Sequence, residues 1–262
     1  MSPQAYNDRG SHADEAVRAY YHRVLPFFEQ ELADRGDAEL WTWAASTPSG
    51  CRVLELGAGT GRATAFLART AGRVVAFDLS PELIAVARRR LSGMANVALL
   101  AADMREVAFK SRFDLVVAVD DPFVHLTQDE DRDRALATAA RHLASGGRFI
   151  IDAAWLSPEQ RRTAALPDGL ALERSGRGAL EVREVWHCDA ETRVCSASFE
   201  YRLRDKPVER VSFPARLWST DELEERARAA GLRIAHLWGD YDRRPWDRAT
   251  SRRLIAELRA RD

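Results

Sequence analysis

Short apolar runs alternate with amphipathic stretches between Arg52 and Ala153, and this alternation predicts the central part of the fold. The runs typical of buried strands lie at 52–56, 73–77, 97–101, 114–119 and 148–153. Stretches with apolar residues at helical spacing lie between them, at 61–71, 81–92 and 129–143. Because strands that alternate with helices form βαβ units, the pattern predicts a parallel sheet.

The pattern differs before and after this region. Apolar positions at helical spacing predict a helix over 13–34, which Pro26 is expected to kink or restart. After Trp155 the chain predicts four successive antiparallel strands, at 170–173, 180–188, 194–203 and 208–217. There is no linker or repeat, so this antiparallel block is interpreted as an insertion in one domain.

The C-terminal region again combines an amphipathic stretch with an apolar run. A helix is expected over 220–230, with acidic residues in its first turn and Gly231 at its end. An apolar segment follows at 232–238, whereas 251–258 is ambiguous between strand and helix.

Composition narrows the classes of function. The 262 residues carry 39 basic and 40 acidic side chains, a formal net charge of −1, which argues against a protein that binds nucleic acid through phosphate contacts. A hydrophobic content of 46% is enough to bury a substantial core in a chain of this length. The histidines and cysteines lack the spacing of metal ligands, so no metal site is expected.

The cysteines and the N-terminal residues indicate the cellular compartment of the protein. Cys51, Cys188 and Cys195 are too few for the disulfide framework of a small secreted domain. Cys188 and Cys195 flank a turn and are expected to be buried reduced thiols. Met1 to Ala16 lacks the apolar core of a signal peptide, and no window approaches a membrane span. We therefore expect a cytoplasmic protein without a membrane partner.

A glycine-rich loop joins the first strand to the next helix. In Glu55-Leu56-Gly57-Ala58-Gly59-Thr60-Gly61, three alternate glycines let the chain turn sharply and expose bare backbone to a ligand. A dinucleotide-binding loop usually has glycine or alanine at position 62, where this chain has Arg62. The loop therefore indicates a nucleotide-type ligand, with NAD in second place.

An acidic residue follows the glycine loop at the distance expected for a ribose contact. Asp78 ends the second strand, about 20 positions after the loop, where a carboxylate accepts from a ribose diol. Ser80 and Pro81 already provide an N-cap and a first-turn proline for the next helix. Asp78 is thus free for a ligand.

These residues resemble the class I S-adenosylmethionine-dependent methyltransferase family, from about Arg52 to Asp152. The resemblance implies that Glu55 contacts the amino group of the cofactor's methionine part, and that Asp103, after the third strand, binds the adenine amine. S-adenosylmethionine has no pyrophosphate, which suits a loop of bare backbone and carboxylates without lysine. The residues assigned to this cofactor are Glu55, Gly57, Ala58, Gly59, Gly61, Asp78, Leu79, Asp103, Met104 and Asp120.

The segment after the fourth strand, Asp120-Asp121-Pro122-Phe123-Val124-His125, is expected to hold the methyl acceptor. It resembles the acidic-Pro-Pro-aromatic motif of amino-group methyltransferases, with Asp121 in place of the first proline. Nitrogen acceptors are therefore modestly favoured over oxygen acceptors. His125, with an ordinary pKa of about 6.5, is the candidate general base, although alignment alone can support methyl transfer.

The resemblance completes the expected fold and function. We expect an α/β domain with a Rossmann-like, seven-stranded and mostly parallel sheet, helices on both faces, an N-terminal helical lid and an antiparallel β insertion. Its parts are the lid 1–50, the cofactor-binding core 51–156, the insertion 157–216 and the C-terminal part of the core 217–262.

The expected reaction moves the methyl group of S-adenosylmethionine to a small molecule and leaves S-adenosylhomocysteine, in a monomer or homodimer. His125 and Asp120 are the catalytic candidates. The candidates for the acceptor pocket are Tyr20, Tyr21, Asp121, Phe123, His125, Trp155 and Trp186. The alternatives are an NAD(P)-dependent oxidoreductase and a regulatory protein that binds S-adenosylmethionine without turnover.

Overall fold

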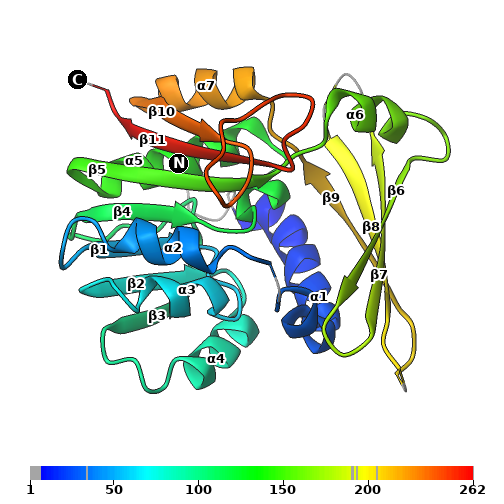
Figure 1. Cartoon of the computed structure of the whole chain (residues 1–262), viewed down its shortest axis with the longest axis horizontal. Coiled ribbons are helices and arrows are strands. Elements are labelled where there is room, and N and C mark those ends of the chain that lie inside the picture. The colour runs from blue at the N-terminus through cyan, green and yellow to red at the C-terminus, as the bar shows by residue number, and fades with distance from the viewer. Residues whose placement is uncertain (1–6, 34, 190–191, 193, 205, 262) are drawn as a thin grey trace.

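Two sheets and one long helix organise the chain (Figure 1). The computed structural model describes residues 7–33, 35–189, 192, 194–204 and 206–261. Its larger sheet has seven strands in the order β10-β11-β5-β4-β1-β2-β3, and its smaller sheet has four in the order β6-β7-β8-β9.

The larger sheet is parallel except at β11, which runs antiparallel to both of its neighbours, β5 and β10. Its strands are β1 (Arg52–Leu56), β2 (Arg73–Asp78), β3 (Val97–Ala101), β4 (Phe113–Ala118), β5 (Leu143–Ala154), β10 (Leu232–Trp238) and β11 (Arg253–Ala260). The expectation of a seven-stranded, mostly parallel sheet is confirmed. The ambiguous segment near 251–258 is the antiparallel strand β11, where Leu254, Ile255, Ala256 and Leu258 are fully buried.

Helices cover both faces of this sheet, as expected. On one face α2 (Ala38–Ala45) and α3 (Arg62–Leu67) share a core with β1, β2 and β4. On the other face α5 (Asp129–His142) packs against β4 and β5, and α7 (Thr220–Ala229) packs against β10. The helix α4 (Pro81–Arg90) lies against β2 and β3. The periodicity did not predict α2, α6 (Pro158–Ala164) or the short 3-10 helix η2 (Pro122–His125), which span only a few turns at most.

The smaller sheet is a meander of four antiparallel strands, as predicted. It consists of β6 (Leu170–Gly176), β7 (Leu180–Cys188), β8 (Val194–Arg202) and β9 (Glu209–Arg216). Along each strand, buried side chains of the inner face alternate with more exposed side chains of the outer face, because successive side chains of a strand point to opposite sides.

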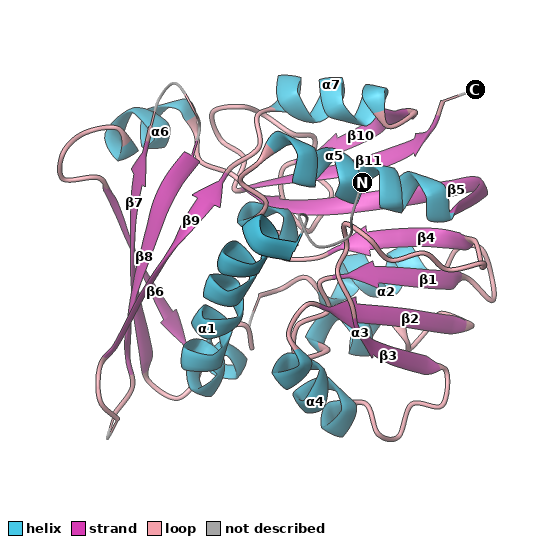
Figure 2. Ribbon diagram, turned by 180° about the vertical axis from the view of Figure 1, so that it is seen from behind, coloured by secondary structure: helices cyan, strands magenta, loops and turns pink. Residues whose placement is uncertain are grey.

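The helix α1 (Asn7–Glu31) lies between the two sheets in both views (Figures 1 and 2). Tyr20, Val24 and Phe27 on one side of α1 pack into the apolar inner face of the smaller sheet. Pro26 lies inside α1 without ending it, so of the two expected effects, a kink or a restart, the helix does not restart there.

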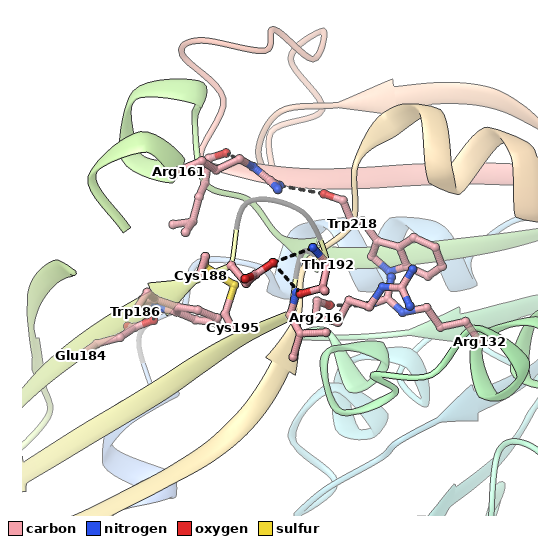
Figure 3. Close-up of a disulfide and its surroundings, with 12 residues drawn as sticks. Arg132, Arg161, Glu184, Trp186, Cys188, Thr192, Cys195, Arg216 and Trp218 are labelled. Carbon is pink, nitrogen blue, oxygen red and sulfur yellow. Dashed lines mark hydrogen bonds between the residues drawn. A yellow bond between two sulfur atoms is a disulfide. The ribbon is translucent and has the colours of Figure 1, made fainter. Parts of the chain in front are cut away.

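Cys188 and Cys195 form a disulfide between β7 and β8, beside Trp186 and Glu184 (Figure 3). The two cysteines are direct partners in the strand register, with Cα atoms 4.0 Å apart. This pairing corrects the expectation of two reduced thiols, because opposite positions of adjacent antiparallel strands bring their Cβ atoms together. Cys51 is free and buried, and burial raises its pKa to about 11.

Within the part of the chain that the structure describes, no helix combines the length and the apolar character that crossing a membrane requires.

Candidate active site

A cavity of about 1740 Å³ opens at the carboxyl ends of the parallel strands, where open α/β sheets bind their ligands. Its walls are the ends of β1, β2 and β4, the helix α1 and the inner face of the smaller sheet. Of the residues that the sequence assigned to cofactor and acceptor, those lining the cavity are Tyr20, Tyr21, Glu55, Gly57, Ala58, Gly59, Asp78, Leu79, Asp103, Met104, Asp120, Asp121, His125, Trp155 and Trp186. Sequence reasoning thus identified residues that the fold brings together from both sheets and α1.

The glycine loop requires glycine for two separate reasons. Gly57 has a φ of 73°, and a Cβ added there would lie 2.5 Å from the Cβ of Pro122 in the loop after β4. Gly61 has a φ of 78°, but a Cβ there would meet Leu91 and Ala87 at the end of α4. Gly61, which the sequence assigned to the cofactor, does not line the cavity and packs closely against α4.

The carboxylate of Asp78 is fixed at the cavity by backbone donors. Its Oδ2 accepts from the Gly59 N–H at 2.9 Å, and its Oδ1 accepts from the Ser80 N–H at 2.9 Å. Burial raises its pKa, and these backbone bonds oppose that rise. Ser80 caps α4 by accepting from Leu83, so the helix does not use Asp78 as its N-cap. Each carboxylate oxygen keeps lone pairs for a hydroxyl ligand.

Glu55 is fully buried beneath the glycine loop. The hydroxyl of Thr64 donates to its Oε2 at 2.6 Å, and burial raises its pKa to about 7. Arg62, which argued against a dinucleotide, is held by Asp37 through two hydrogen bonds of 2.5 and 2.8 Å. Arg62 also lines the cavity, so a cation and a buried carboxyl flank the loop.

Asp103 lines the cavity beside β3, and it already has a cationic partner. Arg105 donates to its two carboxylate oxygens over distances of 2.5 to 3.0 Å. The sequence did not indicate this pair. Leu79 and Met104 add apolar surface next to the two aspartates.

The loop after β4 holds two consecutive residues in the left-handed region, Asp120 with φ 61° and Asp121 with φ 57°. Side chains other than glycine rarely adopt this conformation, and such residues cluster at functional sites. Burial alone would raise the pKa of Asp120, but Arg35, which forms an ion pair with it, and Arg253 hold that pKa below its ordinary value. Asp120 is therefore an ionised member of a charge network.

Asp121 has the opposite character. Its Oδ2 accepts from the Ala154 N–H at 2.9 Å, while its buried Oδ1 has no hydrogen-bond partner among the described residues. Burial raises its pKa to about 7. Asp121, which replaces the first proline of the motif, thus connects the loop to the end of β5 through this hydrogen bond.

His125 lies among aromatic rings. Its Nε2 is 2.9 Å from the hydroxyl of Tyr21, and its ring centroid is 4.8 Å from that of Phe213. Its buried Nδ1 has no partner in the described part of the chain. Burial lowers the pKa of His125 to about 4, below its ordinary value of about 6.5. The imidazole is neutral under ordinary conditions.

Phe123 lies outside the cavity. Its ring is fully buried in the core against Phe149 and Trp218, because η2 turns it toward β5. Phe123 was a candidate for the acceptor pocket, but it does not line the cavity. Trp155 lines the cavity and donates to the Arg248 carbonyl at 3.2 Å, and Trp186 donates to the carboxylate of Glu184.

Several charged residues of the cavity were missed by sequence reasoning: Glu31, Arg35, Arg62, Arg105, Arg174, Glu184 and Arg253. They come from distant parts of the chain and follow no spacing motif. Only the alternation along β7, which places Glu184 on the same face as Trp186, offered a signal.

Comparison with known proteins agrees with this geometry. A family model described as "Methyltransferase domain" matches residues 53–147, which include the glycine loop, Asp78, Asp103 and the loop after β4. The cypemycin N-terminal methyltransferase of a Streptomyces species is 28% identical over 235 residues, covering 84% of this chain and 89% of that protein. Residues 53–147 are thus a methyltransferase domain, and the relatives support an enzyme that depends on S-adenosylmethionine.

Solved structures of methyltransferases share its fold. The CcbJ methyltransferase of Streptomyces caelestis aligns with a TM-score of 0.71 at 23% identity, covering 87% of this chain and 90% of that one. CalS10, an amino pentose methyltransferase from Micromonospora echinaspora solved with S-adenosylmethionine bound, aligns with a TM-score of 0.63 at 26% identity, covering 93% and 96%. The oxidoreductase alternative gains no support from these comparisons.

The residues of this methyltransferase fit the chemistry of its cofactor. S-adenosylmethionine presents a diol, an adenine amine, an ammonium and a carboxylate. The cavity offers the carboxylates of Asp78 and Asp103, the buried carboxyl of Glu55 and the cations of Arg35 and Arg62. The bare backbone at Gly57 and Gly59 leaves room beside them.

Gly57→Ala is expected to weaken S-adenosylhomocysteine binding at least about tenfold, because the new Cβ forces the loop away from Pro122. Gly231→Ala is the matched control, since Gly231 has a φ of 76° and a Cβ there would meet no heavy atom within 4 Å. Both variants should lose about 1–2 kcal/mol of stability from the left-handed backbone, but only the first should lose affinity. Calorimetric titration and thermal unfolding measure the two effects, and wild-type affinity in Gly57→Ala would contradict the account.

Proposed function

We propose that this methyltransferase transfers the methyl group of S-adenosylmethionine to a nitrogen atom of a small-molecule acceptor. The observation that carries this proposal is the continuity of the cavity. One end has the glycine loop and carboxylates, and the other has the aromatic inner face of the smaller sheet, with the Asp120–His125 loop between them.

The proposed roles follow from this arrangement. Asp78 accepts from the ribose hydroxyls, Asp103 from the adenine amine, and Glu55 faces the methionine ammonium. Ala58, Leu79 and Met104 provide the remaining contacts to the nucleoside and methionine parts. The chain acts as one domain, in which residues 51–156 and 217–262 form the core, residues 1–50 the lid, and residues 157–216 the acceptor wall.

Bound S-adenosylmethionine supplies an electrophilic methyl group on a sulfonium sulfur. The protein must then bring a nucleophile into line with it and exclude water, and such alignment contributes several kcal/mol. Tyr20, Tyr21 and His125 surround the position next to the Asp120 loop, while Trp155 and Trp186 add apolar walls. The two carboxyls of Asp120 and Asp121 shape the loop backbone.

A nitrogen acceptor is favoured by the site and by its relatives. Asp120 and His125 give the acceptor side an ionised carboxylate and a neutral imidazole, which suit an amine donor. The named relatives include an N-terminal methyltransferase and an amino pentose methyltransferase. A regulatory protein that only binds S-adenosylmethionine would not need a cavity that extends beyond the cofactor residues.

His125 acts in this proposal by aligning the acceptor. A group whose pKa is about 4 is a weak base toward an ammonium, whose proton is held at a far higher pKa. The hydrogen bond to Tyr21 fixes the imidazole plane, and the imidazole ring forms part of the cavity wall. An ammonium acceptor therefore loses its proton to water before transfer, because only the neutral amine has the lone pair that attacks the methyl group.

The function is tested with S-adenosylmethionine labelled on its methyl group, incubated with separate pools of small amines and of small alcohols and phenols. We expect label in amine products and none in ether products, with calorimetric binding of S-adenosylhomocysteine and none of NAD. Label found only in ether products would show that the acceptor atom is oxygen and not nitrogen. Binding of NAD in place of S-adenosylhomocysteine would refute the proposed function.

His125→Ala is expected to lower turnover by no more than about tenfold and to leave the pH–rate profile unchanged between about pH 6 and pH 9, since the imidazole does not titrate there. Any ionisation near pH 7 in both enzymes would come from Glu55 or Asp121, whose pKa values are raised to about 7. A loss above about a hundredfold together with the disappearance of an ionisation would identify His125 as a general base.

A further inference from the structure

A buried cluster of charge lies on the acceptor wall. Arg174 of β6 forms ion pairs with Glu31 at the end of α1, at 2.7 Å, and with Glu184 of β7, at 2.9 Å. Trp186 donates its indole N–H to Glu184, and the hydroxyl of Tyr201 donates to Glu31. Arg174, Glu31 and Glu184 all line the cavity.

This cluster carries more negative than positive charge. Two carboxylates share one guanidinium, while Tyr201 and Tyr20 stay neutral because burial raises their pKa values. The side chains of Glu31 and Glu184 are only 9% and 11% exposed, so water screens this excess poorly. Burial raises the pKa of Glu31, and Arg174 and Arg35 oppose that rise.

An anion is disfavoured at this place. Both terminal nitrogens of Arg174 already face carboxylates, and an anionic ligand would lie against Glu31 and Glu184. A cation would instead meet carboxylate oxygens that retain free lone pairs, and the ring of Trp186 would stabilise it further. The other cation nearby on the α1 side, Arg35, is paired with Asp120.

The cluster lies away from the glycine loop, although Arg174 helps to lower the pKa of Asp120. Arg174 and Glu184 belong to the smaller sheet, which stands on the far side of α1 from β1 and β2 (Figures 1 and 2). The cavity nevertheless reaches both places, and its volume of about 1740 Å³ exceeds that of an ordinary small-molecule pocket. An extended acceptor can therefore contact the cluster while its reacting atom lies beside His125.

We propose that Glu31, Glu184 and Trp186 form a subsite for a cationic group at the end of the acceptor remote from the methylated atom. This inference rests on the proposed function and adds the class of substrate, a molecule with a basic group besides the atom that receives the methyl. Arg174 positions the two carboxylates and prevents their mutual repulsion. Acceptors without a second cation, and anionic acceptors, are selected against.

Three indole compounds test the charge preference: tryptamine, tryptophol and indole-3-acetate, which end in an ammonium, a hydroxyl and a carboxylate. Their binding is measured by calorimetry on the full chain saturated with S-adenosylhomocysteine. We expect tryptamine to bind at least about tenfold more tightly than indole-3-acetate, with tryptophol between them. Equal binding of the three, no binding of tryptamine or preference for the carboxylate would overturn the subsite.

Variants locate the preference at the cluster. Glu184→Gln and Glu31→Gln should each weaken tryptamine binding about tenfold and leave tryptophol binding within about twofold, because only the charge is removed. Glu173→Gln is the matched control, since Glu173 precedes Arg174 on the exposed face of the same strand. If both cluster variants keep the wild-type preference for tryptamine, the cation binds elsewhere and the proposal is wrong.

The affinity of each variant for S-adenosylhomocysteine separates this inference from the proposed function. Unchanged cofactor affinity shows that the variants are folded, and Glu184→Gln keeps the test valid if Glu31→Gln releases α1. If the wild-type protein binds S-adenosylhomocysteine but shows no preference for tryptamine, the subsite alone is rejected. Failure of wild type to bind the adenosyl compound rejects the proposed function itself, and the subsite with it.

Discussion

The active-site cavity depends on the position of α1 between the two sheets. One side of the helix is buried in the smaller sheet through Tyr20, Val24 and Phe27, and ion pairs fix its end, from Glu31 to Arg174 and from Glu29 to Arg90 of α4. Beyond it, Arg35 reaches Asp120 in the loop after β4. Exposed ion pairs stabilise little, but a partly buried pair is costly to break. The helix α1 is therefore held by apolar packing and oriented by charge.

The edge of the parallel sheet imposes a second constraint. The glycine loop and the loop after β4 approach so closely that Gly57 has no room for a Cβ beside Pro122, and Asp120 and Asp121 adopt left-handed backbone at the same place. Buried carboxyls with divergent pKa values gather there, with Asp120 held ionised and Asp121 and Glu55 raised to about 7. Such divergence is typical of functional sites, because burial and nearby arginines act on each group differently.

The sequence predicted most of the fold, and it selected cofactor candidates most of which line one cavity, because both inferences depend on local signals. Apolar periodicity located β1, β3 and β7 at their observed bounds, and the glycine loop with Asp78 follows a spacing that the strand–turn–helix geometry requires. Phe123 was misplaced because its direction depends on the turn made by η2, which no periodicity shows. The disulfide and the Glu31–Arg174–Glu184 cluster depend on long-range register, which one sequence does not reveal.

The central claim is that one cavity holds the cofactor at the sheet edge and the acceptor against the smaller sheet. A crystal structure with S-adenosylhomocysteine tests it most directly. The account predicts the ribose hydroxyls on Asp78, the adenine beside Asp103, and the sulfur facing His125 and the smaller sheet. A nucleoside bound away from Asp78, or a sulfur atom that faces away from the Asp120–His125 loop, would contradict it.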